Sequence, residues 1–118
     1  MKISDIKELL EAEVLCCEEN IDCEACSACG SDMMSDVLAY VKDQAVLLTG
    51  LVNSQVIRTA QMMDMVCIVF VRSKMPTEEM IELSKNAGIV LMTTKKRMYE
   101  ACGKLYKSGL VGNGEIHG

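Results

Sequence analysis

The chain has 118 residues and a net charge of −5, and half of its residues are apolar. This composition predicts one folded domain with a hydrophobic core. The acidic balance excludes a general nucleic-acid or anionic-membrane binder, and no apolar run reaches the roughly 18 residues of a membrane span. The polar start has no apolar leader, so the sequence predicts a soluble cytoplasmic protein without a nucleic-acid or membrane partner.

The first third of the chain predicts two helices on either side of a cysteine-rich loop. A short amphipathic helix is indicated by apolar residues at helical spacing, namely Ile3, Ile6, Leu9 and Leu10. A brief strand at Val14 and Leu15 follows, and then an acidic loop at residues 16–30. A second helix is expected to start at Ser31 or Asp32.

The rest of the chain alternates apolar strands with helices. The strands are expected at residues 45–49, 65–71 and 89–92. Helices should begin after Asn53 or Ser54, after Thr77, and near Lys95, where the last one runs to Ser108. Short, fully apolar strands between helices predict an α/β three-layer sandwich, with a mainly parallel sheet of about four to five strands covered by helices on both faces. Residues 1–110 are expected to form this domain and residues 111–118 a flexible tail.

The strand ends suggest a first candidate site. In a parallel sheet the carboxyl ends of the strands share one edge, where ligands meet helix amino termini. Hydroxyl, glycine and basic residues suited to a small anionic ligand follow three of the strands, namely Thr49, Gly50, Asn53, Ser54, Arg72, Lys74, Thr93, Thr94 and Lys95. The alternative is that these residues are ordinary helix caps and surface lysines.

A cysteine cluster suggests a second candidate site. Cys23, Cys26 and Cys29 have the spacing of three iron–sulfur ligands, and Cys16 or Cys17 could supply the fourth. Four thiolates also suit zinc, which is the less favoured metal here. A redox dithiol, or a thiol-rich loop without a cofactor, is the alternative. Cys67 lies in an apolar strand and is expected to be an inert core thiol.

Charge is also unevenly placed along the chain. Residues 1–43 hold eleven acidic and three basic residues, whereas residues 44–118 hold six and nine. The acidic loop could dock a basic partner, and an open sheet edge could pair in a homodimer.

Four stretches of the sequence resemble the DRTGG domain family. They lie at residues 31–38 (SDMMSDVL), 46–53 (VLLTGLVN), 87–94 (AGIVLMTT) and 99–106 (YEACGKLY), and the resemblance covers about residues 1–110. The signature that names the family is reduced here to Thr49-Gly50. The resemblance implies a fold similar to the amino-terminal domain of HPr kinase/phosphorylase. It also implies a role like that of the regulatory parts of phosphotransacetylase-like proteins, or of short stand-alone members encoded near iron-only hydrogenase subunits in anaerobes.

Some members of this type are labelled serine kinases, but the chain has no G-x-x-x-x-G-K-[ST] phosphate loop. We therefore predict a non-catalytic regulatory or accessory domain that binds a small ligand. Its expected partners are hydrogenase or electron-transfer subunits. The alternative is a small iron–sulfur or zinc redox protein that uses the cysteines between Cys16 and Cys29.

Overall fold

A computed structural model describes residues 1–40 and 44–111. It confirms the predicted α/β alternation. The five helices of the described residues are α1 (Ile3–Leu10), α2 (Met34–Tyr40), α3 (Ser54–Met62), α4 (Glu78–Ala87) and α5 (Met98–Lys107). The five strands of the same residues are β1 (Glu13–Cys16), β2 (Ser27–Gly30), β3 (Ala45–Thr49), β4 (Cys67–Phe70) and β5 (Val90–Thr93).

The strands form one sheet in the order β1-β5-β4-β3-β2. The four strands from β2 to β5 are parallel, and β1 is antiparallel to β5. Every residue of β3, β4 and β5 is buried, as expected for strands covered on both faces. The predicted sheet is therefore confirmed, with β1 as its one antiparallel strand.

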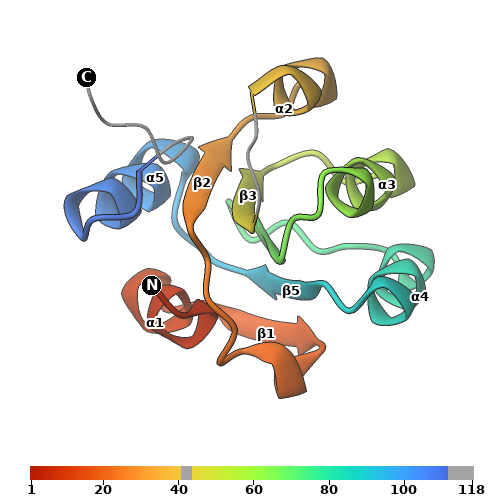
Figure 1. Ribbon diagram of the computed structural model, residues 1–118, viewed down its shortest axis with the longest axis horizontal. Helices are drawn as coiled ribbons and strands as arrows, with labels where there is room; N and C mark the ends of the chain where they lie inside the picture. The colour runs from red at the N-terminus through yellow and green to blue at the C-terminus, as the bar shows by residue number, and fades with distance from the viewer. Residues whose placement is uncertain (41–43, 112–118) are drawn as a thin grey trace.

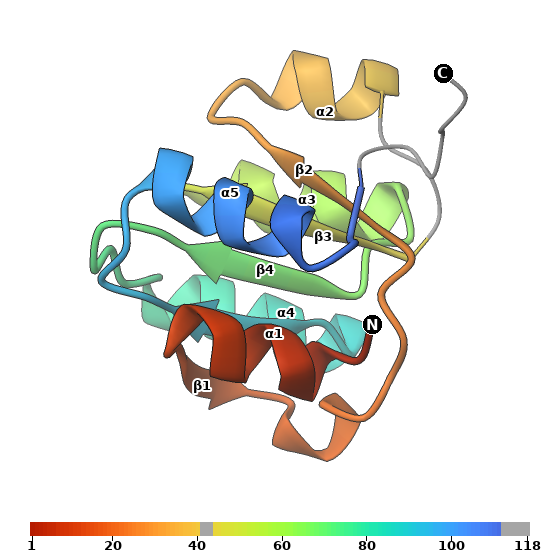
Figure 2. The same cartoon turned by 90° about the vertical axis from the view of Figure 1, so that its left-hand side faces the viewer.

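Helices cover both faces of the sheet. Figure 1 shows α1 and α5 on one side, and α3 and α4 on the other, with α2 beside α3 near the β2 edge. Figure 2 shows that α1 and α5 lie side by side over the sheet. The apolar faces of α1 and α3 therefore bury Ile3, Ile6, Val56 and Ile57 completely.

The helix boundaries follow from local chemistry. Asn53 accepts a hydrogen bond from the N–H of Gln55 and so caps α3, and Thr77 accepts one from the N–H of Met80 in α4. The helix α4 ends at Gly88, whose φ of 73° is a left-handed conformation that favours glycine. These boundaries agree with the caps predicted for the two helices.

The segment predicted as a cysteine-rich loop contains regular structure. It includes a short 3₁₀ helix at Glu18–Asn20 and the strand β2, which pairs parallel with β3 from Ser27↔Ala45 to Gly30↔Leu48. The strand was missed because its four residues are small and form no apolar run. Its ladder hydrogen bonds to β3 stabilise it, and these depend on the tertiary fold.

The described residues end at Val111, whose carbonyl oxygen accepts a hydrogen bond from the N–H of Ala28. The predicted flexible tail at 111–118 otherwise lies outside the described residues. Among residues 1–40 and 44–111, every helix is too short or too polar to cross a bilayer.

Candidate functional site

The carboxyl ends of three parallel strands meet at one edge of the sheet. After β3, β4 and β5 the chain continues into residues 50–53, 71–77 and 94–97. Although these segments are far apart in the sequence, the parallel topology places them side by side. This edge therefore gathers most of the predicted anion-binding residues.

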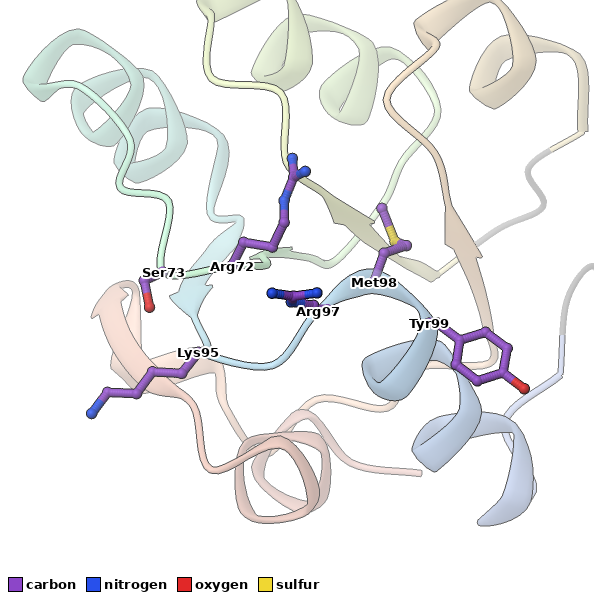
Figure 3. A pocket seen from close by; sticks show the side chains of 6 residues that line it. All are labelled: Arg72, Ser73, Lys95, Arg97, Met98 and Tyr99. Carbon is purple, nitrogen blue, oxygen red and sulfur yellow. The ribbon is translucent and has the colours of Figure 1, made fainter.

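A cavity of about 660 Å³ opens at this edge. It is lined by Arg72, Ser73, Lys95, Arg97, Met98 and Tyr99. Figure 3 shows the guanidinium group of Arg97 near the middle of the site and that of Arg72 extending toward the end of β3, whereas Lys95 and Tyr99 point outward on opposite sides. Three cationic side chains around one hollow suit a ligand with several negative oxygens.

The loop that carries Arg72 is hydrogen-bonded to the segment that follows β5. The N–H of Arg72 donates to the carbonyl of Lys96 at 2.9 Å, and the N–H of Ser73 donates to that of Thr94 at 2.8 Å. Both Arg72 and Ser73 have a φ of 58°, which non-glycine residues adopt at a cost. Strained residues of this kind cluster at ligand sites, where the surrounding hydrogen bonds hold them.

Asp32 joins the ends of three strands and was not predicted as a site residue. Its Oδ1 accepts hydrogen bonds from the Thr49 hydroxyl at 3.0 Å and from the Gly50 N–H at 2.7 Å. Its Oδ2 lies 4.0 Å from a guanidinium nitrogen of Arg72. That guanidinium also packs directly over Gly50, where a Cβ would collide with it. Asp32 and Gly50 therefore position Arg72 at the edge of the cavity.

A smaller cavity of about 230 Å³ adjoins the first one. It is lined by Glu11, Glu13, Ser73, Thr93, Thr94 and Lys95. The hydroxyl of Thr93 donates to the carbonyl of Lys74 at 2.7 Å, and that of Thr94 donates to the carbonyl of Leu10 at 2.7 Å. These two predicted ligand residues therefore use their hydroxyl protons to hold the loops together.

Five predicted ligand residues line neither cavity, namely Thr49, Gly50, Asn53, Ser54 and Lys74. Asn53 caps α3 through its side chain, and Ser54 is the first residue of that helix. Lys74 is exposed, and its carbonyl accepts the hydroxyl of Thr93. Of the predicted residues, Arg72 and Lys95 therefore line the larger cavity and Thr93, Thr94 and Lys95 the smaller one, and Gly50 lies under the Arg72 guanidinium.

Sequence reasoning missed Asp32, Ser73 and Arg97. Arg97 extends the basic pair Lys95-Lys96 by one residue, so the run itself was a signal for it. Asp32 was assigned only a helix-start role, and its contact with the end of β3 depends on the pairing of β2 with β3. No local pattern in the sequence could predict that contact.

The cysteines of the second candidate site separate in the fold. Cys16 lies at the end of β1 and Cys29 on β2, and these strands are the opposite edges of the sheet. Four spacings between neighbouring strands separate those edges by roughly 19 Å. Within residues 1–40 and 44–111, no three Cys, His, Asp or Glu side chains gather into a metal-binding group. The described residues therefore do not fit a cluster shared by Cys16 and Cys29.

The individual thiols lie in different environments. Cys16 and Cys17 are buried, and their sulfur atoms lie 3.8 and 3.7 Å from the carbonyls of Ile89 and Ser84. Cys23 and Cys26 are exposed, whereas Cys29 is half-buried.

Burial disfavours the thiolate form of several of these groups. It raises the pKa of Cys17 to about 11, with a further contribution from the neighbouring Cys16. Burial also raises the pKa of Cys29, to which Cys102 and Asp36 add. Cys67 is fully buried in β4 and its pKa is raised by burial, which agrees with the predicted inert core thiol.

Comparison with known families assigns the chain to one of them. The family profile described as the DRTGG domain matches residues 5–108. The chain therefore belongs to the DRTGG domain family, and the predicted resemblance is confirmed. A search of curated proteins found no match.

A solved structure has a similar fold. It is described as the CBS and DRTGG domains of the regulatory region of Clostridium perfringens pyrophosphatase, complexed with the activator diadenosine tetraphosphate. The TM-score is 0.74 at 16% sequence identity, and the match covers 96% of this chain. The chain spans about half of that structure, since 48% of it is covered. At this identity the likeness shows the fold.

Proposed function

We propose that this chain is a regulatory or accessory domain that binds a small phosphorylated ligand at the carboxyl edge of its sheet. The observation that carries the proposal is the cavity lined by Arg72, Lys95 and Arg97. Among the described residues, Lys95 and Arg97 form no ion pair, and Arg72 has only Asp32 at 4.0 Å. Their charges are therefore free to bind the oxygens of a phosphate.

The family assignment supports a regulatory role. The similar solved structure is the regulatory region of a pyrophosphatase and holds a nucleotide activator, diadenosine tetraphosphate. By analogy, the present chain would bind its ligand without transforming it and would pass the binding state to a partner. We further propose hydrogenase or electron-transfer subunits as that partner, on the resemblance of the sequence to short stand-alone family members.

Titration calorimetry with pyrophosphate and with ATP tests the ligand proposal. We expect Arg97→Gln and Arg72→Gln each to weaken binding at least about tenfold, because each removes a charge-assisted hydrogen bond worth about 1.5 kcal/mol or more. Arg58→Gln is the matched control, since Arg58 is exposed on α3 and lines neither cavity. The proposal would be overturned if neither pyrophosphate nor ATP binds. It would also be overturned if Arg58→Gln weakens binding as much as the two other variants do.

The iron–sulfur alternative stays a prediction, and the structure supports it less than it supports the anion site. Cys23 and Cys26 are exposed and could take part, but Cys16 and Cys29 lie at opposite edges of the sheet. Iron, zinc and sulfide analysis of protein purified without oxygen tests it directly. Stoichiometric iron and sulfide, lost in Cys23→Ser, would restore this alternative.

The homodimer also stays a prediction. β2 is an edge strand, which could pair with a strand of a second chain. One of its backbone donors, the N–H of Ala28, is already hydrogen-bonded to the carbonyl of Val111. Sedimentation across a range of protein concentrations tests whether two chains associate.

A further inference from the structure

The two cavities at the carboxyl edge form one hollow with two different ends. They share Ser73 and Lys95 as lining residues. We call the larger part, with Arg72 and Arg97, the basic lobe, and the smaller part, with Glu11 and Glu13, the acidic lobe. A ligand that fills both lobes meets cations at one end and carboxylates at the other.

The acidic lobe offers hydrogen-bond acceptors. Both of its threonine hydroxyl protons are donated to backbone carbonyls, as described above. Glu13 is exposed on β1 and has no ion pair among the described residues, and Glu11 lies 3.9 Å from the ammonium group of Lys96. Besides Ser73 and Lys95, which this lobe shares with the basic lobe, the groups left for a ligand are the two carboxylates, which accept hydrogen bonds from O–H or N–H groups and repel a phosphate.

This polarity also fixes the direction of a bound ligand. A phosphate in the basic lobe would contact Arg72 and Arg97, and whatever is attached to it would extend past Ser73 and Lys95. The attached part must present hydroxyl or amino hydrogens to Glu11 and Glu13. A sugar joined to a phosphate meets this requirement, because its hydroxyls donate to carboxylates in charge-assisted hydrogen bonds.

We propose that the hollow binds a phosphate ester of a sugar, with the phosphate in the basic lobe and the sugar hydroxyls on Glu11 and Glu13. This inference rests on the proposed function and names the ligand class for the same site. Nucleotides and free sugar phosphates share this chemistry. The basic lobe, at about 660 Å³, is within the usual size range of small-molecule sites.

The test compares inorganic phosphate, ribose 5-phosphate and ATP by titration calorimetry on the full chain. We expect ribose 5-phosphate to bind about tenfold more tightly than phosphate. Glu13→Ala and Glu11→Ala should each remove most of that advantage without weakening phosphate binding, because each removes a charge that repels the phosphate. Glu82→Ala is the matched control, because Glu82 is exposed on α4 and lines neither lobe. Thermal melts of each variant establish that it is folded, and Glu11→Ala serves if Glu13→Ala does not fold.

The outcomes separate the two proposals. If neither phosphate nor ATP binds, the proposed function itself fails. If phosphate binds but ribose 5-phosphate binds no more tightly, or if Glu13→Ala and Glu11→Ala weaken both ligands equally, only the sugar phosphate inference fails. Where the inference holds, tighter binding of ATP than of ribose 5-phosphate identifies a nucleotide, and the reverse order identifies a free sugar phosphate.

Discussion

The carboxyl edge of the sheet and the cysteine-rich segment at residues 16–30 differ in how sequence distance relates to distance in space. Arg72 and Lys95 are far apart in the chain, yet they line one cavity because parallel strands end at the same edge. Cys16 and Cys29 are close in the chain, yet they lie on opposite edge strands. Short sequence spacing therefore indicates a shared site only when no sheet separates the residues.

The two regions also differ in the charge that they offer to a ligand. The edge exposes the basic side chains of Arg72, Lys95 and Arg97, whose positive charge attracts an anion. In contrast, Cys17 and Cys29 would have to lose a proton before binding a metal, and burial raises the pKa of both thiols.

The largest expected effect contrasts the two regions directly. The double variant Arg72→Gln/Arg97→Gln should weaken ATP binding about a hundredfold, since two charge-assisted hydrogen bonds are lost at about 1.5 kcal/mol or more each. A triple Cys→Ser variant at Cys23, Cys26 and Cys29 should leave the affinity unchanged. Calorimetry on both variants measures the difference. A large loss of affinity in the triple variant would show that the two regions are coupled.

Alkaline pH should separate the buried cysteines from the exposed ones. The unfolded Cys17 thiol ionises near pH 9.0, whereas the folded one stays protonated to about pH 11. The stabilisation is therefore complete below pH 9 and is lost as the pH rises toward 11. At about 1.4 kcal/mol for each unit of pKa, the loss is about 2–3 kcal/mol.

Urea melts at about pH 8 and about pH 10.5 would measure the larger part of this loss. Cys17→Ala should reduce the difference between the two free energies of unfolding. Cys23→Ala, at an exposed position, should not change it. Equal pH dependence in the two variants would contradict the assignment to Cys17.

One substitution at two positions sharpens the comparison further. Cys67→Ser places a hydroxyl in the fully buried strand β4, and an unpaired buried hydroxyl costs about 1–3 kcal/mol. Cys23→Ser, at the surface, should change the free energy of unfolding by less than about 0.5 kcal/mol. Chemical denaturation of each variant and of the unchanged protein measures these free energies of unfolding. Equal effects at the two positions would be inconsistent with the burial described here.

The smallest expected effect concerns Asp32. Asp32→Ala removes the acceptor for the Thr49 hydroxyl and the Gly50 N–H, at a cost of about 1 kcal/mol because water partly replaces it. The melting temperature should fall by about 4 °C. Asp22→Ala, at an exposed aspartate in the cysteine-rich segment, is the control and should leave it unchanged.

Much of the fold could be predicted from local patterns. The apolar runs at residues 45–49 and 89–92 became β3 and β5, and Asn53 and Thr77 became the caps of α3 and α4. The candidate anion site was predicted in part, through Arg72 and Lys95. Its other members come from residues with no periodic or motif signal, such as Asp32.

The sequence by itself determined the alternation of helices with the strands β3, β4 and β5 and the burial of these strands. Both depend on apolar periodicity and helix caps, which act over a few residues. The family was indicated by the resemblance of four short stretches. The tertiary structure alone decided that β2 exists, that β1 runs antiparallel at the far edge, and that Asp32 holds the loop of Gly50. The physical reason is that strand pairing and ion placement join residues distant in the chain, and only the folded sheet brings them within hydrogen-bonding distance.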